Sequence, residues 1–395
     1  MESSLYIHIP FCIQKCDYCD FFSCPVSREI PDDYVEALCN EIIYRSGELS
    51  IDFWKTVYIG GGTPSLLSPG QMDKLVSAIS GGISKSKTEE ISMEMNPESV
   101  TEEKLKAAWN LGVTRISMGI QSFNTNALKT INRHCSATKA QSALETVKKH
   151  WKGRLNLDAI AGLPGQSDEE FLASLEKIIF FDPDHISLYT LTVEEETPLF
   201  DKIEKGQVVF DFDTADRQWI SGRDMLLKKG YMQYEVSNFS KPGMESLHNM
   251  VYWTQNNYAG AGAGATGTIY GDKNLRWTNT QDIDQYIHFW LDLENTGKQQ
   301  IPAELEKLDN ETLEFEYLMM GLRTFHGISS SDYKRKFKDV SPWHGSLEKR
   351  LGTDRGIWKK FTDDGMAETR QVENSTVYSL NHKGILFLNQ LLVSL

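Results

Sequence analysis

The sequence predicts an α/β fold in which six βα units form a partial barrel and a mainly helical unit follows them. Three observations support this fold class. Short apolar runs alternate with amphipathic stretches through the first 240 residues. Successive units are spaced by roughly 25–50 residues, the length that a crossover between parallel strands requires. Beyond residue 240 the pattern changes. Six units are too few to close an eight-unit barrel, so we expect one open side.

The individual elements follow from hydrophobic periodicity and from capping signals. We expect strands at residues 5–9, 56–59, 90–95, 114–120, 155–160 and 185–191. Between them, a helical period predicts helices at residues 33–44, 69–79, 102–111, 138–150, 168–180 and 214–229. Ser167 and the acids after it are typical of a helix start. Gly112 and Gly230 follow helical stretches, where a left-handed C-cap is expected.

The changes in pattern divide the chain into three expected parts. Residues 1–240 form the partial barrel, residues 241–300 form a connecting region of loops around short strands, and residues 301–395 form the C-terminal domain. In this domain we expect helices at 311–322 and 330–337, a hairpin near 377–380 and a closing helix at 382–393. That order is typical of a winged helix. The small-residue run at 259–267 indicates backbone packed close to a flat ligand or to another chain segment.

Composition limits the partners and the compartment. The chain has 395 residues, 24% of them charged, and a formal net charge of −14, which disfavours nucleic acid as a main ligand. The basic run at 334–338 is interpreted as a solvated helix face. There is no apolar run of about 18 residues and no signal-peptide pattern at the N-terminus. We therefore expect a cytoplasmic protein with at most peripheral membrane contact.

Three of the six cysteines lie on one expected loop directly after the first strand. Cys12, Cys16 and Cys19 form a C-x3-C-x2-C pattern, and thiolates at such short spacing can hold one face of an iron–sulfur cluster. Three protein ligands would leave the fourth iron open for chemistry. A zinc site that recruits His8 or Cys24 is the alternative, whereas a disulfide is disfavoured in the cytosol.

The chain opens with the segment YIHIPFC at residues 6–12, and Cys16, Tyr18 and Cys19 follow it. This pattern resembles the opening of the radical S-adenosylmethionine (SAM) superfamily. More narrowly, it resembles the oxygen-independent coproporphyrinogen III oxidases and the related HemW-type heme chaperones. The resemblance covers residues 5 to about 270. It implies a radical SAM barrel with a [4Fe–4S] cluster on the three cysteines, whose open iron binds SAM.

The same resemblance implies a set of SAM-binding residues but no assigned catalytic residue. The set comprises Tyr6, Tyr18, Gly61, Gly62, Thr63, Glu94, Gln121, Arg133, Asp158 and Thr192. For each position taken singly, a tight turn or a structural hydrogen bond is the alternative. Taken together, most of these motifs fall at or just beyond the carboxyl end of an expected parallel strand, where the βα loops of a barrel converge on ligands.

Features outside the barrel motifs separate the two branches of the family. Residues 20–23 read DFFS, which resembles the chaperones, and the cysteine loop begins close to the N-terminus. The segment HNMVYW at residues 248–253 matches an HNxxYW motif that is associated with heme in the chaperone branch. The resemblance therefore implies heme b as a cofactor, with His248 as its candidate ligand. The alternative is a buried histidine that caps a turn beside core aromatics.

We therefore interpret the chain as a HemW-type protein that binds heme and delivers it to a heme-accepting protein. The alternative is an enzyme that decarboxylates coproporphyrinogen III by radical chemistry to make protoporphyrinogen IX. A radical enzyme that modifies tRNA is disfavoured by the negative charge. The sequence leaves open whether SAM is cleaved and whether the chain forms a homodimer.

Overall fold

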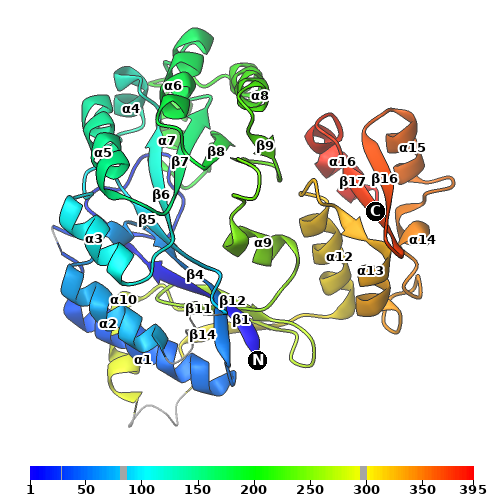
Figure 1. Ribbon diagram of the computed structural model, residues 1–395, viewed down its shortest axis with the longest axis horizontal. Coiled ribbons are helices and arrows are strands. Elements are labelled where there is room, and N and C mark those ends of the chain that lie inside the picture. Colours follow the sequence, from blue (N-terminus) through cyan, green and yellow to red (C-terminus); the bar gives the residue numbers. More distant parts are fainter. Residues whose placement is uncertain (28, 81–86, 294–299) are drawn as a thin grey trace.

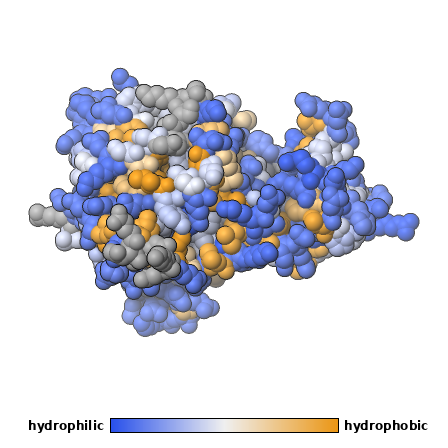
Figure 2. Space-filling model, turned by 90° about the horizontal axis from the view of Figure 1, so that it is seen from below, coloured by the Kyte–Doolittle hydropathy of each residue, from blue (hydrophilic) through white to orange (hydrophobic). Residues whose placement is uncertain are grey.

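The structure is a computed structural model that describes residues 1–27, 29–80, 87–293 and 300–395. It consists of an α/β body around one twelve-stranded sheet and a C-terminal unit with a three-stranded sheet (Figure 1). Helix α9 (Leu247–Trp253) lies on the side of the body that faces the C-terminal unit. Seen from below, hydrophilic residues cover much of the surface, and apolar patches interrupt it (Figure 2).

Parallel strands form the centre of the large sheet. Their spatial order is β11 (Tyr258–Ala261), β1 (Glu2–Ile9), β4 (Phe53–Gly61), β5 (Glu90–Met95), β6 (Arg115–Gln121), β7 (Arg154–Ala161) and β8 (His185–Thr190). All six strands expected from the sequence are present, which confirms the parallel α/β fold class. These strands are largely buried, as expected for a parallel sheet covered by helices. The seventh parallel strand, β11, was not expected in this position.

Helices cover the sheet in the order that the periodicity predicted. They are α1 (Asp32–Glu48), α2 (Pro69–Ile79), α3 (Glu102–Asn110), α5 (Ala137–His150), α6 (Asp168–Phe180) and α8 (Phe212–Lys228). Capping boxes at Ser68 and Ser167 begin α2 and α6, because each serine and the residue at the third helical position satisfy each other's backbone N–H groups. Two short helices, α4 (Thr125–Thr130) and α7 (Pro198–Glu204), were not predicted.

The large sheet extends past both ends of its parallel part. β9 (Met232–Gln233) and β10 (Asn238–Ser240) extend it past β8, while β12 (Thr266–Ile269), β13 (Leu275–Asn279) and β14 (Ala303–Lys307) extend it past β11. The expected region of loops around short strands thus contributes strands to the main sheet, and α10 (Ile283–Leu291) packs on α1. The three-part division of the chain remains a prediction, but the sheet crosses its boundary at residue 240.

The Gly/Ala-rich run packs against other segments of the chain. A Cβ on Gly260 would lie 2.2 Å from the carbonyl oxygen of Thr266, so the β11–β12 hairpin needs a glycine there. Beside this hairpin, the buried Glu41 carboxylate accepts hydrogen bonds from the Gly262 N–H at 2.8 Å and from the Tyr286 hydroxyl at 2.6 Å. Arg45 lies 3.5 Å from the same carboxylate. The small residues of the Gly/Ala-rich run therefore allow close packing around the buried carboxylate of Glu41, which is hydrogen-bonded.

The C-terminal unit has a hydrophobic core of its own, which runs from Leu308 to Leu392. Its elements are α12 (Asn310–Gly321), β15 (Ile328–Ser329), α13 (Ser330–Phe337), α14 (Leu347–Leu351), α15 (Ile357–Asp363), β16 (Ala367–Val372), β17 (Ser375–Leu380), the 3-10 helix η3 (Gly384–Phe387) and α16 (Leu388–Val393). The β16–β17 hairpin pairs with β15, in the order expected of a winged helix. The closing helix begins with a 3-10 turn instead of running unbroken from residue 382.

Among the described residues, no helix combines the length and the apolar character that crossing a bilayer would require.

Candidate functional site: a cavity at the carboxyl rim of the sheet

A cavity of about 410 Å³ opens where the central parallel strands end. It brings together most of the residues that the sequence singled out: Cys12, Cys16, Tyr18, Cys19, Gly61, Gly62, Thr63, Glu94, Gln121, Arg133, Asp158 and Thr192 all line it. Ligand sites of α/β barrels occupy this rim because loops from several strands converge there. Tyr6 and His248 do not line the cavity.

Cys12 ends the short strand β2 (Phe11–Cys12), and Cys16 and Cys19 follow on the loop that leads to its partner strand, β3 (Cys24–Pro25). The Thr63 hydroxyl donates to Cys12 Sγ at 3.4 Å, and the Arg133 guanidinium donates to Cys16 Sγ at 3.5 Å. Burial raises the pKa of the Cys12 thiol and raises that of Cys19 to about 11. These thiols therefore release protons when a metal centre binds them.

Cys12, Cys16 and Cys19 line one cavity and supply the thiolates that an iron–sulfur cluster takes. Throughout the part of the chain that the structure describes, no three His, Cys, Asp or Glu side chains are grouped so as to hold one metal ion. A cubane cluster spreads its thiolates over separate irons, so its ligands need not converge on one point. The candidates for a fourth zinc ligand also lie elsewhere. His8 contacts Tyr6 and the Phe22 carbonyl through its two nitrogens, and Cys24 does not line the cavity.

The glycine motif after β4 holds the cysteine loop against the sheet. The Gly62 N–H donates to the Ile9 carbonyl at 2.8 Å, and a Cβ at this position would lie 2.6 Å from the Phe11 carbonyl oxygen. Gly61 has a positive φ of 112°, and its Cβ would meet the His8 ring at 2.6 Å. Only glycine allows the backbone after β4 to come this close to Phe11 and His8. The motif therefore determines where the cysteine-bearing segment begins.

Two buried carboxylates and one arginine line the cavity together with the cysteines. Glu94 accepts hydrogen bonds from the Tyr58 hydroxyl at 2.8 Å and from the Gly61 N–H at 3.1 Å. Burial, opposed by these two bonds, raises the pKa of Glu94 to about 7. Asp158 accepts from the Asn156 amide at 2.7 Å, and burial raises its pKa as well. Arg133 donates to the Gly119 carbonyl at 2.6 Å.

Two polar atoms at this rim are buried and have no hydrogen-bond partner, namely Gln121 Oε1 and Arg133 Nε. Gln121 also has a positive φ of 66°, which is unusual for a residue with a side chain. Strained backbone and unsatisfied buried atoms are both typical of ligand sites. A polar ligand in the cavity would satisfy both atoms, so the residues present fit a group such as SAM.

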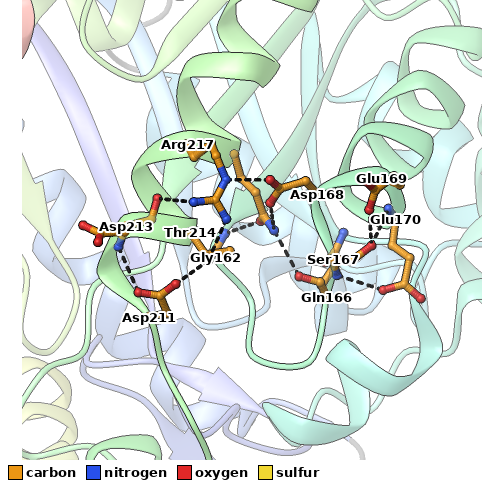
Figure 3. Close-up of polar contacts among 11 residues, drawn as sticks. Gly162, Gln166, Ser167, Asp168, Glu169, Glu170, Asp211, Asp213, Thr214 and Arg217 are labelled. Atoms are coloured by element: carbon orange, nitrogen blue, oxygen red, sulfur yellow. Dashed lines mark hydrogen bonds and ion pairs between the residues drawn. The ribbon is translucent and has the colours of Figure 1, made fainter.

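The loop that follows β7 is held from outside the cavity. The Gly162 N–H donates to Gln218 Oε1 at 2.9 Å, and the Gln218 amide donates to the Gln166 carbonyl at 3.0 Å. On the surface beside it, Arg217 pairs with Asp168 at 2.6 Å, which links α8 to the first turn of α6 (Figure 3). This network fixes the chain that continues from the strand carrying Asp158.

Sequence reasoning missed two residues that line the cavity, Asn96 and Tyr189, and one that supports a lining residue, Tyr58. Tyr58 supports Glu94 from the neighbouring strand, the Asn96 amide donates to the Thr63 hydroxyl at 3.0 Å, and Tyr189 lines the cavity at the end of β8. Asn96 lies two positions after Glu94, so the alternation of strand side chains could have indicated it. Tyr58 and Tyr189 carried no such signal, because an aromatic residue within a strand is ordinarily part of the core.

His248 lies in the protein interior, away from the cavity. Its side chain is fully buried on α9, Nδ1 lies 2.7 Å from the Thr56 hydroxyl and Nε2 lies 2.9 Å from the Tyr252 hydroxyl. Burial lowers its pKa to about 3. The ring packs against Tyr58, with centroids 5.2 Å apart. Both nitrogens are occupied in this arrangement, which corresponds to the buried structural histidine given above as the alternative to a heme ligand.

Comparisons with known proteins agree with this fold. The profile of the radical SAM superfamily matches residues 6–178. The coproporphyrinogen III oxidase HemN of Escherichia coli, a radical SAM enzyme, superposes with a TM-score of 0.79 at 20% identity, covering 100% of this chain and 89% of that one. The protein is thus of the radical SAM class, which implies a [4Fe–4S] cluster and SAM as its cofactors.

Two bacterial relatives define the family more narrowly. The protein "Heme chaperone HemW" of Escherichia coli strain K12 is 33% identical over 401 residues, covering 98% of this chain and 97% of the relative. The "Heme chaperone HemW" of Lactococcus lactis strain IL1403 is 34% identical over 337 residues, covering 85% of each. The chain belongs to the HemW family.

The glycine motif yields a test of how the site is built. We expect Gly62→Ala to lower the thermal unfolding midpoint, because its new methyl group overlaps the Phe11 backbone and forces the cysteine loop away from β4. Gly70→Ala is the matched control, since nothing lies within 4 Å of its Cβ position. Equal unfolding midpoints for the two variants would contradict the packing described here.

Proposed function

We propose that this chain binds heme and delivers it to an acceptor protein in the cytoplasm, while SAM and a [4Fe–4S] cluster are held in the rim cavity. The observation that carries this proposal is the near full-length similarity to proteins named heme chaperone HemW. The DFFS segment after Cys19 and the HNMVYW motif support the chaperone branch over the oxidase branch. The fold shared with HemN is common to both branches and does not separate them.

In this proposal the cysteine loop holds the cluster. Cys12, Cys16 and Cys19 line one wall of the cavity and are the ligands that we assign. When bound, the cluster supplies one-electron chemistry to SAM. The hydroxyl of Thr63 and the guanidinium of Arg133 donate to two of the sulfur atoms. Such donors stabilise the negative charge that thiolates carry.

The polar wall of the cavity is assigned to SAM. SAM carries an ammonium and a sulfonium, which two buried carboxylates, Glu94 and Asp158, can balance. Its own carboxylate finds a cation in Arg133. The rest of the set that we carry over from the family consists of the glycine motif, Tyr18, Gln121 and Thr192, which line the cavity. Tyr6 belongs to the same set but does not line the cavity, and its hydroxyl contacts His8.

The pKa of Glu94 gives this assignment a pH dependence. SAM binding needs the carboxylate, so affinity should fall as the pH drops through about 7. The Tyr58 hydroxyl lowers the pKa of Glu94, so Tyr58→Phe should raise that pKa and move the loss of affinity to higher pH. Calorimetric titration of SAM into the reconstituted protein across the neutral range measures the midpoint.

Tyr231→Phe is the matched control for this measurement. It removes another buried tyrosine hydroxyl, which donates to the Pro183 carbonyl well outside the cavity lining. We expect its midpoint to equal that of the wild type. If Tyr58→Phe also left the midpoint unchanged, Glu94 would not be the group that binds the ammonium of SAM.

The function itself is tested by supplying both candidate substrates without oxygen. The reconstituted protein with SAM should bind hemin stoichiometrically and pass it to an apo-hemoprotein, which the Soret absorbance of the acceptor reports. Given coproporphyrinogen III under the same conditions, it should form no protoporphyrinogen. Formation of protoporphyrinogen, or failure to bind hemin, would overturn the proposal.

A further inference from the structure

A chain of buried hydrogen bonds runs beneath the rim cavity, between strands β7 and β8. Asn156 and Asp158 are two positions apart on β7, so their side chains lie on the same face of the sheet. His185 pairs with Asn156 in the register of β7 and β8. Asp158 lines the cavity, whereas Asn156 and His185 do not. These two side chains belong to residues that are 3% and 1% exposed, so their polar atoms need partners within the protein.

Three side chains join Asp158 to a backbone N–H. The Asn156 amide donates to Asp158 at 2.7 Å, and Asn156 Oδ1 lies 2.6 Å from His185 Nδ1. On the other side of the ring, His185 Nε2 lies 2.8 Å from the Tyr234 hydroxyl. The N–H of Ser246 donates to that hydroxyl oxygen at 3.3 Å. One continuous path of hydrogen bonds therefore leads from the cavity to the N-cap of α9.

The donor of each hydrogen bond in this path follows from the groups at its two ends. A backbone N–H only donates, so the Tyr234 oxygen accepts from Ser246 and the Tyr234 proton is donated to His185 Nε2. A neutral imidazole then carries its proton on Nδ1 and donates it to Asn156 Oδ1. The N–H groups of Asn156 consequently face Asp158. The reverse order would place Asn156 Oδ1 against a carboxylate, which only accepts.

The surroundings of the two titratable groups agree with this order. Burial, together with the charge of Arg115, lowers the pKa of His185 well below its ordinary value, so the ring stays neutral near pH 7. Burial raises the pKa of Asp158, and hydrogen bonds from Ser187 and Asn156 oppose that rise. The amide donor that His185 orients therefore favours the ionised carboxylate.

We propose that His185 is a positioning residue for SAM, which holds the Asn156 amide with its N–H groups toward Asp158 and so keeps Asp158 an acceptor. This inference rests on the assignment of Asp158 to SAM in the function proposed above. A carboxylate that accepts can balance a positive charge of SAM, whereas a protonated carboxyl group cannot. His185 lies outside the cavity lining and acts only through Asn156.

The role of His185 is tested by calorimetric titration of SAM into the full-length reconstituted protein. His185→Leu removes the donor to Asn156 and should weaken SAM binding about fivefold, the usual effect of losing one intramolecular hydrogen bond. His185→Asn is the matched variant, because asparagine branches like leucine but carries an N–H group near the position of Nδ1. It should bind SAM within about twofold of the wild type. Both variants lose the contact with Tyr234, so the effect of shortening the ring is common to them.

A double-mutant cycle shows whether the effect of His185 passes through Asp158. Asp158→Asn removes one of the two carboxylates assigned to SAM and should weaken binding about tenfold. Adding His185→Leu to Asp158→Asn should cause no further loss, because no carboxylate remains for the Asn156 amide to hold. A purely structural role for His185 would instead give the same loss in both backgrounds.

The tautomer of His185 provides a readout that does not depend on SAM. In protein with isotope-labelled histidine, nuclear magnetic resonance should show the His185 ring neutral, with Nδ1 protonated and Nε2 unprotonated. The resonances are identified by their absence from His185→Asn. Tyr234→Phe removes the donor to Nε2 and should shift the ring toward the tautomer that is protonated on Nε2.

The outcomes separate the positioning role from the proposed function. If Asp158→Asn binds SAM like the wild type, the assignment of Asp158 is wrong and the inference falls with it. If Asp158→Asn weakens binding but His185→Leu does not, or if His185→Asn weakens it as much as His185→Leu, His185 does not position Asp158. A wild-type ring protonated on Nε2 would also overturn the inference, whatever the variants do. Circular dichroism and unfolding midpoints check that the variants fold.

Discussion

The rim cavity depends on the parallel register of the central strands. Glu94 on β5 pairs with Ser117 on β6, and Gly119 pairs with Asp158 on β7, so side chains from successive strands reach the rim at neighbouring levels. Strand side chains alternate between the two faces of a sheet, so a register shift of one residue would point every side chain of that strand to the opposite face. The hydrophobic core below the rim opposes such a slip, since its buried residues would have to exchange with polar ones.

Buried charge is the second constraint at this rim. Two carboxylates with raised pKa values and one arginine share a cavity where burial penalises every ion. Hydrogen bonds from Tyr58, Gly61 and Asn156 offset part of that cost. A ligand that carries both positive and negative groups would offset more of it. The cavity that holds the thiols therefore also presents polar atoms that lack hydrogen-bond partners.

Helix α9 packs against the strands that support the rim cavity. His248 and Tyr252 hold it against the barrel, and His248 packs on Tyr58, which in turn supports Glu94 at the rim. The neighbouring face of the helix, with Leu247 and Met250, lines a separate cavity at the amino ends of β1 and β4. Helix α9 is thus linked to the rim cavity only indirectly, through Tyr58.

The sequence predicted the strands and helices of the barrel because their periodicity is strong and their caps are explicit. The sequence also predicted that the cavity residues lie close together, because the carboxyl ends of neighbouring parallel strands meet at the same edge of the sheet. It did not predict that Tyr6 would turn to His8, or that His248 would be enclosed by Thr56 and Tyr252. These contacts join residues up to 192 positions apart. The sequence predicted short strands among loops after residue 240 but not their pairing with the main sheet, because the pairing of β11 with β1 joins segments far apart in the chain.

The measurement that tests the central claim most directly is the iron and acid-labile sulfide content of Cys16→Ser after anaerobic reconstitution. Cys39→Ser, on α1 and outside the cavity lining, is the control. The account predicts a full [4Fe–4S] complement in the wild type and in Cys39→Ser, and loss of most iron and sulfide in Cys16→Ser. Zinc in place of iron in the wild type, or unchanged iron and sulfide in Cys16→Ser, would contradict it.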